Sequence, residues 1–194
     1  LTLLQANHFD EAQAVSAHAA TLAPSDPLLA AIQGQIAERQ GDVHQAVQLY
    51  ARAVALDPDA GRHHLRLGAA LLQAGEVEGA LTHLEQATQL EPARSAGWVL
   101  LCRALLRTRQ SERALACAQR ATQLAPNDGA AWRQFAAAAE VRGQTDAALD
   151  AYNRATTLRP TKEWFVAYAE LALAHGRDDR GRAALRQAGE LDPE

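Results

Sequence analysis

The 194-residue sequence has no methionine, only two cysteines and very few aromatic residues. Aromatic side chains make up 5% of the chain, whereas hydrophobic residues as a whole make up 48%. The two cysteines, Cys102 and Cys117, are too few for the disulfide framework of a small secreted domain, and they leave the redox compartment open. Alanine alone contributes 45 residues, so we expect a hydrophobic core of small side chains packed at close range.

Long hydrophobic runs and a strong positive charge are also missing from the sequence. No run reaches the roughly 18 consecutive apolar residues of a membrane-spanning helix, so we expect no direct membrane insertion. The net charge of −4 argues against a general binder of nucleic acids or anionic membranes. The 19 cationic residues include a single lysine, Lys162, so the abundance of arginine does not by itself indicate a function.

Proline recurs at a regular interval along the chain. The spacing is 34 residues, or 33 for the last pair, between Pro24, Pro58, Pro92, Pro126, Pro160 and Pro193. A glycine stands 17 residues before four of these prolines, at Gly41, Gly75, Gly143 and Gly176, and Arg109 takes that place once. Because glycine closes helices and proline cannot continue them, each interval predicts two helices of about 14 residues. Apolar residues within each interval recur at helical spacing, which favours helices over strands.

Small and large residues also occupy fixed positions of each interval. With the proline as position 32, small residues hold position 8, at Gly34, Gly68, Cys102, Ala136 and Ala169. Large residues hold position 24, at Tyr50, Leu84, Tyr152 and Leu185. On these residues, and on Trp98 and Trp132 at position 4, the chain resembles the tetratricopeptide repeat family. The resemblance implies an all-α fold, a right-handed α-solenoid of stacked antiparallel helix pairs in which each unit is stabilised by its neighbours.

The resemblance divides the chain into one partial and five complete units of a single solenoid, residues 1–194. The units are residues 1–26 (partial), 27–60, 61–94, 95–128, 129–161 and 162–194. Residues 1–4 are apolar, and no polar capping helix follows the last unit, although solenoids normally carry polar caps. We therefore expect either a segment cut from a longer protein or self-association through the open ends.

No catalytic motif of a known mechanistic type is present, so we expect no enzyme activity and no cofactor. His63 and His64 are adjacent on a helix and point about 100° apart, so they cannot share a metal ion, and we expect packing roles and no metal site. Cys102 and Cys117 are expected to be packing thiols. Trp164 and Tyr168, four residues apart, predict a core pair, with a stacking platform as the alternative.

In the tetratricopeptide repeat family, the first helix of each unit lines a concave groove where extended peptides bind. Carried onto this chain, the groove positions hold arginines in the central units, with apolar and amide side chains between them. The candidate groove residues are Gln35, Arg62, Leu65, Arg66, Val99, Arg103, Arg107, Arg133 and Gln134. Arg62 and Arg66 resemble half of the clamp with which some members hold a chaperone C-terminus, but Ile32 stands where the clamp needs Asn.

These residues favour a non-catalytic scaffold that binds an extended acidic or acidic-apolar segment of a partner protein, because arginine pairs bidentately with carboxylates. Three alternatives stay open. The arginines could be ordinary solvated surface in an arginine-rich chain. The chain could instead be the docking arm of a larger transferase or hydroxylase, or of a secretion or polysaccharide-export assembly. Single-stranded nucleic acid is disfavoured, since the groove has no aromatic ladder on which bases could stack.

Overall fold

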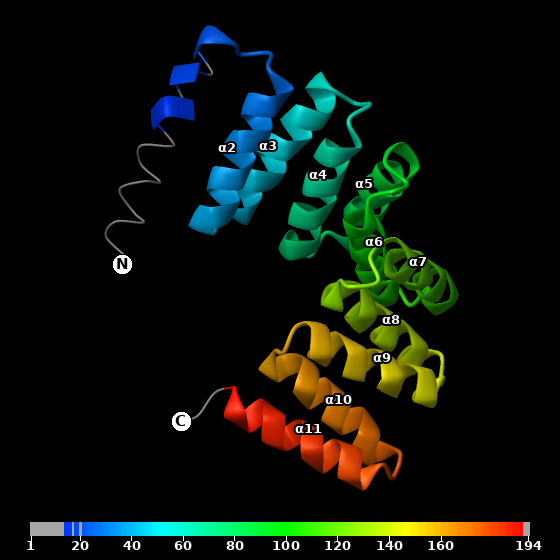
Figure 1. Ribbon diagram of the computed structural model, residues 1–194. Coiled ribbons are helices and arrows are strands. Elements are labelled where there is room, and N and C mark those ends of the chain that lie inside the picture. The colour runs from blue at the N-terminus through cyan, green and yellow to red at the C-terminus, as the bar shows by residue number, and fades with distance from the viewer. Residues whose placement is uncertain (1–13, 17, 20, 192–194) are drawn as a thin grey trace. The chain divides into compact units, whose positions relative to one another are not determined.

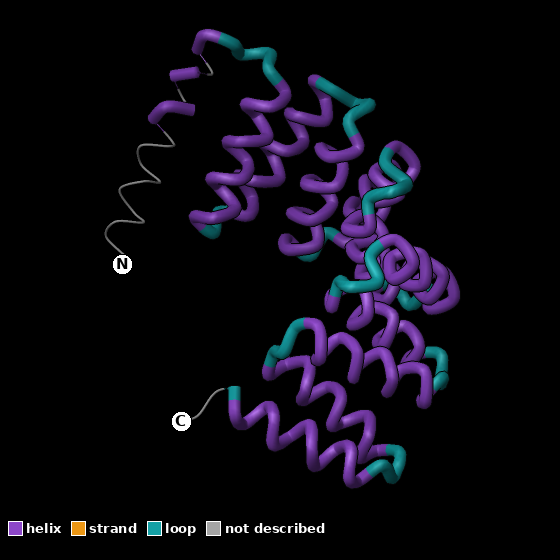
Figure 2. Tube along the Cα trace, in the orientation of Figure 1, coloured by secondary structure: helices purple, strands orange, loops and turns teal. Residues whose placement is uncertain are grey.

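The computed structural model describes residues 14–16, 18–19 and 21–191, and these residues are almost entirely helical (Figures 1 and 2). The expected apolar edge at residues 1–4 lies outside the described residues. The chain divides into two compact units, Leu1–Pro92 and Ala93–Glu194, which are described separately below. The interpretation of residues 1–194 as one continuous solenoid therefore stays a prediction.

Each unit is built from consecutive helix pairs joined by short turns. The first contains α2 (Pro27–Gln40), α3 (Val43–Leu56), α4 (Gly61–Ala74) and α5 (Val77–Leu90). The second contains α6 (Ser95–Arg107), α7 (Ser111–Leu124), α8 (Gly129–Val141), α9 (Thr145–Leu158), α10 (Lys162–Ala174) and α11 (Asp178–Glu190). The two helices of a pair pack along their lengths, and in the first unit α3 also packs against α4, so pairs stack on one another. The predicted pair of helices in each 34-residue interval is thus confirmed.

Local sequence signals set the helix ends. Asp26 and Asp128 cap α2 and α8 by accepting a hydrogen bond from a backbone N–H of the first turn. Within four of the described helix pairs the turn contains a glycine with positive φ, as at Gly41 (83°) and Gly75 (84°). In the α6–α7 turn Arg109 adopts the same left-handed conformation with φ of 59°. The chain therefore requires this backbone conformation even where it has no glycine to supply it.

The core is formed by small residues on one helix facing large residues on another. A Cβ added to Gly34 would lie 2.7 Å from a ring carbon of Tyr50, and one added to Gly68 would lie 2.6 Å from Leu84. Tyr50 and Leu84 are themselves fully buried. The small residue at position 8 and the large residue at position 24 therefore fit together as one contact, which explains why both positions recur.

Carbonyl oxygens of the interval prolines hold the turns between pairs. Pro58 O lies 3.0 Å from Nε2 of His64, and Pro126 O accepts a hydrogen bond of 2.8 Å from the indole of Trp132. Arg52 donates to Pro24 O at 2.6 Å. A proline that ends one helix thus anchors side chains of neighbouring helices through its free carbonyl.

The last two helix pairs of the second unit share an extensive apolar cluster. It includes Phe165, Tyr168, Tyr152 and Leu149, with Trp132 and Phe135 packed at its edge. Trp164 is half-buried, and the guanidinium of Arg159 lies 5.8 Å from the centre of its ring. Tyr168 is a core residue as expected, whereas Trp164 lies at the rim. Among the described residues, no helix combines the length and apolar character needed to cross a bilayer.

Candidate functional site

In the first unit, the candidate groove arginines lie beside acidic groups. Arg62, exposed on the first turn of α4, forms an ion pair with Asp57 at 3.9 Å. Arg66 is also exposed, one turn further along α4. Burial and the hydrogen bond to Glu38 raise the pKa of Tyr50 above its usual range, and the positive charge of Arg66 partly opposes this rise. Arg66 therefore lies within electrostatic reach of the Tyr50–Glu38 pair, so neither arginine acts as an isolated cation.

The remaining candidates of the first unit offer contact area and hydrogen-bonding groups. Leu65 on α4 and Gln35 on α2 are both half-buried. Gln73, at the C-terminal end of α4, donates a long hydrogen bond of 3.5 Å to Glu38. Glu38 thus accepts from Tyr50 and from Gln73, and this surface of the first unit is electrostatically mixed.

In the second unit, three arginines form what we call the arginine cluster, Arg103 and Arg107 on α6 and Arg133 on α8. Burial lowers the pKa of Arg103, and the neighbouring positive charges of Arg107 and Arg133 lower it further. The Nε atom of Arg103 is buried and has no hydrogen-bond partner within the described part of the chain. The charge of Arg103 therefore lies beside two like charges at a place where it has lost part of its hydration.

Gln134 brings α6 and α8 into contact beside the arginine cluster. Its backbone oxygen accepts a weak hydrogen bond from the thiol of Cys102 at 3.8 Å, so the helix that carries Arg103 approaches the helix that carries Arg133. The Gln134 side chain is only 6% exposed, and its Oε1 finds no donor among the described residues. Its assignment to the groove stays a prediction, and the structure adds that the residue is buried. Val99 on α6 is half-buried.

The electrostatic surroundings of Arg103 and Arg133 differ from those of Arg62, which is paired with Asp57. Arg103 and Arg133 have no ion pair to an acidic side chain in the described chain, although Arg133 lies close enough to Tyr152 to influence its pKa. Tyr152 in turn donates a hydrogen bond of 3.0 Å to Glu140. The buried Nε–H of Arg103 and the buried Oε1 of Gln134 leave one donor and one acceptor unused.

The cysteine and histidine side chains considered as candidates for chemistry are buried by helix packing. Burial raises the pKa of the Cys102 thiol to about 12, with a smaller contribution from Cys117, so Cys102 is a packing thiol as expected. His63 and His64 are 1% and 7% exposed, which confirms their packing positions. Over the described residues, no three or more His, Cys, Asp or Glu side chains converge as a metal-binding group.

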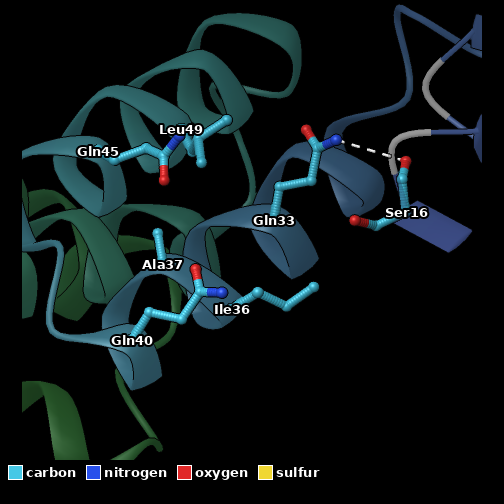
Figure 3. A pocket seen from close by; sticks show the side chains of 7 residues that line it. All are labelled: Ser16, Gln33, Ile36, Ala37, Gln40, Gln45 and Leu49. Carbon is cyan, nitrogen blue, oxygen red and sulfur yellow. Dashed lines mark hydrogen bonds between the residues drawn. The ribbon is translucent and has the colours of Figure 1, made fainter. Parts of the chain in front are cut away.

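A small hollow lies on the first unit away from the candidate arginines. Figure 3 shows its lining of Gln33, Ile36, Gln40 and other residues of α2 and α3, with Gln33 donating to the Ser16 oxygen at 3.4 Å. Its volume is about 160 Å³. The lining side chains are mainly amides and alkyl groups, and they offer no charged group for recognising a ligand.

Sequence reasoning missed the contacts that two glutamates near the candidate groove make with buried tyrosines. Glu38 and Glu140 occupy position 12 of their 34-residue repeats and accept hydrogen bonds from the tyrosines at position 24. The recurrence of Glu at position 12 together with Tyr at position 24 is visible in the sequence and could have predicted both contacts. By contrast, the sequence carries no signal for the proximity of His64 and His83, which lie 19 residues apart on different helices.

Comparisons with known proteins agree with this geometry. Two family models, each described as tetratricopeptide repeat, match residues 1–59 and 33–96, and residues 71–139. A comparison with curated protein sequences found no match.

Several solved structures are similar to the chain. The structure of pilF from Pseudomonas aeruginosa has a TM-score of 0.82 and 20% identity, covering 100% of this chain and 88% of that chain. TTC0263 from Thermus thermophilus, a tetratricopeptide repeat protein, has a TM-score of 0.73 and 24% identity, covering 87% and 92%. YrrB, described as a tetratricopeptide repeat protein with an unusual peptide-binding site, has a TM-score of 0.70 and 20% identity, covering 92% and 93%. The expected fold class, stacked antiparallel helix pairs of an all-α solenoid, is confirmed.

Proposed function

The chain belongs to the tetratricopeptide repeat family, and from this premise we propose that it binds an acidic or acidic-apolar segment of a partner protein at the arginine cluster of its second unit. Proteins of this family generally act as interaction scaffolds without catalytic activity of their own. The observation that carries the proposal is the half-buried Arg103, which lies beside Arg107 and Arg133 and forms no ion pair with an acidic side chain of the described residues.

Binding an acidic segment would relieve an unfavourable arrangement of charge. A carboxylate placed between Arg103 and Arg133 can accept charge-assisted hydrogen bonds from both guanidinium groups. Exposed ion pairs contribute about 0.2–1 kcal/mol each, so a micromolar complex, which needs about −8 kcal/mol, also requires apolar contact. Val99 and its neighbour Leu100, both half-buried on α6, are suitable for that contact.

A peptide ligand is favoured over a bare inorganic anion by the half-buried apolar side chains Val99 and Leu100 on α6, which the side chains of a peptide can contact. The similar structure of YrrB is described as holding an unusual peptide-binding site, which supports testing peptide ligands first.

The test measures binding of an acidic peptide library to the intact chain before and after charge reversal. Arg103→Glu and Arg133→Glu should each weaken binding of the selected peptides at least tenfold. Arg120→Glu is the matched control, because Arg120 is an exposed arginine on α7, outside the cluster, and its reversal changes the net charge equally. Equal losses in all three variants would indicate general electrostatic attraction, and unchanged affinity in the first two would refute the proposed site. The contribution of Arg62, Leu65, Arg66 and Gln35 in the first unit is tested separately with Arg66→Glu.

A further inference from the structure

Two histidines of the first unit, His64 on α4 and His83 on α5, meet side by side. Their Nδ1 atoms are 3.1 Å apart, and the ring centres are 5.2 Å apart with a tilt of 37° between the planes. His64 is 7% exposed, whereas His83 is half-buried and reaches the surface. Both side chains extend from well-packed helices of one pair, so their separation is fixed by the backbone.

The surrounding hydrogen bonds decide which ring nitrogens carry protons. The Nε2 atom of His64 lies 3.0 Å from Pro58 O, and a carbonyl can only accept, so this Nε2 carries the hydrogen. Neutral His64 then has its lone pair on Nδ1, which faces Nδ1 of His83. This is the arrangement found around metal-bound histidines, in which a backbone carbonyl fixes the tautomer and aims the other nitrogen at the ion.

We propose that His64 and His83 form a two-histidine binding site for a divalent transition-metal ion, with Nδ1 of each ring as a ligand. Zinc–nitrogen bonds are about 2.0–2.1 Å long, so two nitrogens on a tetrahedral ion lie about 3.3–3.4 Å apart. The observed 3.1 Å requires the rings to separate by only a few tenths of an ångström. Binding moves the proton of His83 from Nδ1 to Nε2 through solvent, and both imidazoles remain neutral.

The imidazole nitrogens of His64 and His83 favour some divalent metal ions over others. Imidazole nitrogens suit Zn²⁺, Ni²⁺ and Cu²⁺, whereas Mg²⁺ and Ca²⁺ prefer oxygen ligands. No third His, Cys, Asp or Glu joins the pair among the described residues, so water molecules complete the coordination on the exposed side of His83.

Titration of the untagged intact chain with Zn²⁺ at pH 7.5, followed by calorimetry, tests the site. We expect one Zn²⁺ per chain, tighter uptake of Cu²⁺ in line with the general affinity order, and no uptake of Mg²⁺. His83→Gln and His64→Gln should each lower the Zn²⁺ affinity at least tenfold. His44→Gln is the matched control, because His44 is an exposed histidine on α3 of the same unit and should leave the affinity unchanged.

Histidine ring resonances provide a second measurement that does not depend on a stable variant. Zinc should shift the ring nitrogens of His64 and His83 in the wild-type chain and leave those of His44 in place. If His64→Gln weakens folding, His83→Gln and these resonances carry the test. The proposal is overturned if the wild-type chain takes up no Zn²⁺, or if His83→Gln binds Zn²⁺ as tightly as the wild type.

Discussion

The hydroxyl of Tyr50 donates a hydrogen bond of 2.8 Å to Oε2 of Glu38, and Tyr152 makes the same bond to Glu140 at 3.0 Å. In both cases the tyrosine lies on the second helix of a pair and the glutamate near the end of the first, 12 residues earlier. The contact therefore joins the two helices of a pair at the same position in two different 34-residue repeats.

Removing this hydroxyl should destabilise the chain. Tyr50→Phe should lower the free energy of unfolding by about 1–3 kcal/mol, because a hydrogen bond to a charged carboxylate is lost while ring packing is kept. Urea unfolding followed by circular dichroism measures the effect. Tyr168→Phe is the control, since Tyr168 is a buried tyrosine whose hydroxyl makes no hydrogen bond to the described residues. Equal losses in both variants would mean that the Glu38 contact contributes little.

Arg109 should be replaceable by glycine with a gain in stability. Its φ of 59° places a side-chain-bearing residue in the left-handed region, which costs about 1–2 kcal/mol. Arg109→Gly removes that strain but adds freedom to the unfolded chain, so we expect a net gain of about 0.5–1 kcal/mol.

The converse substitution provides the check on this prediction. Gly75→Ala introduces a side chain at φ of 84° without any steric contact within 4 Å, so its expected loss of about 1 kcal/mol reports backbone strain alone. Thermal unfolding of both variants should therefore shift in opposite directions. A lower melting temperature for Arg109→Gly would show that the Arg109 side chain stabilises the turn by more than its backbone strain.

Gly68 should not tolerate even a methyl group. An alanine Cβ there would lie 2.6 Å from Cγ of Leu84 and 3.4 Å from the backbone oxygen of Ala80, so α4 and α5 would have to move apart. We expect Gly68→Ala to cost about 1–3 kcal/mol of unfolding free energy. Gly189→Ala serves as the control in α11, where nothing lies within 4 Å, and should stabilise by about 0.5–1 kcal/mol through helix propensity alone. A neutral Gly68→Ala variant would contradict the close approach of the two helices.

Cys102 should be unreactive in the folded chain and reactive after unfolding. Burial raises its pKa to about 12, so the reactive thiolate is scarce at pH 8, and the sulfur is fully enclosed. Because the folded pKa lies above the unfolded value of about 9, this thiol's contribution to stability is complete below pH 9 and is lost between pH 9 and pH 12. Alkylation of a Cys117→Ser variant at pH 8, with and without denaturant, measures the difference. Rapid modification without denaturant would contradict the burial of Cys102.

The repeated helix pairs could be predicted from the sequence because the same spacing constraint acts on every unit. Proline, glycine and the small residues recur at fixed positions, because each meets a local requirement of the backbone or of helix packing. Arg109 shows how strong this constraint is, since the position takes the left-handed conformation without a glycine. Cys102, whose position alone predicts a packing residue, is fully buried.

The electrostatic state of the candidate site could not be predicted in the same way. The groove positions name which side chains share a helix face, but whether an arginine has an acidic neighbour depends on side chains from other helices. Arg62 is paired with Asp57 across a turn, whereas Arg103 has no such partner in the described structure. The burial of Gln134 could not be predicted from its position in the repeat, because it depends on how neighbouring helices pack around it.

The proline carbonyls that anchor the turns set a rule for how the units can diverge. Pro58 O is met by an imidazole and Pro126 O by an indole, both from position 4 of the following unit. At these two joints the carbonyl is met by a ring that fills space and carries an N–H, and histidine and tryptophan both supply one. Exchange of one for the other at His64 or Trp132 can therefore change the surface chemistry of a repeat while the joint keeps its N–H contact to the proline carbonyl.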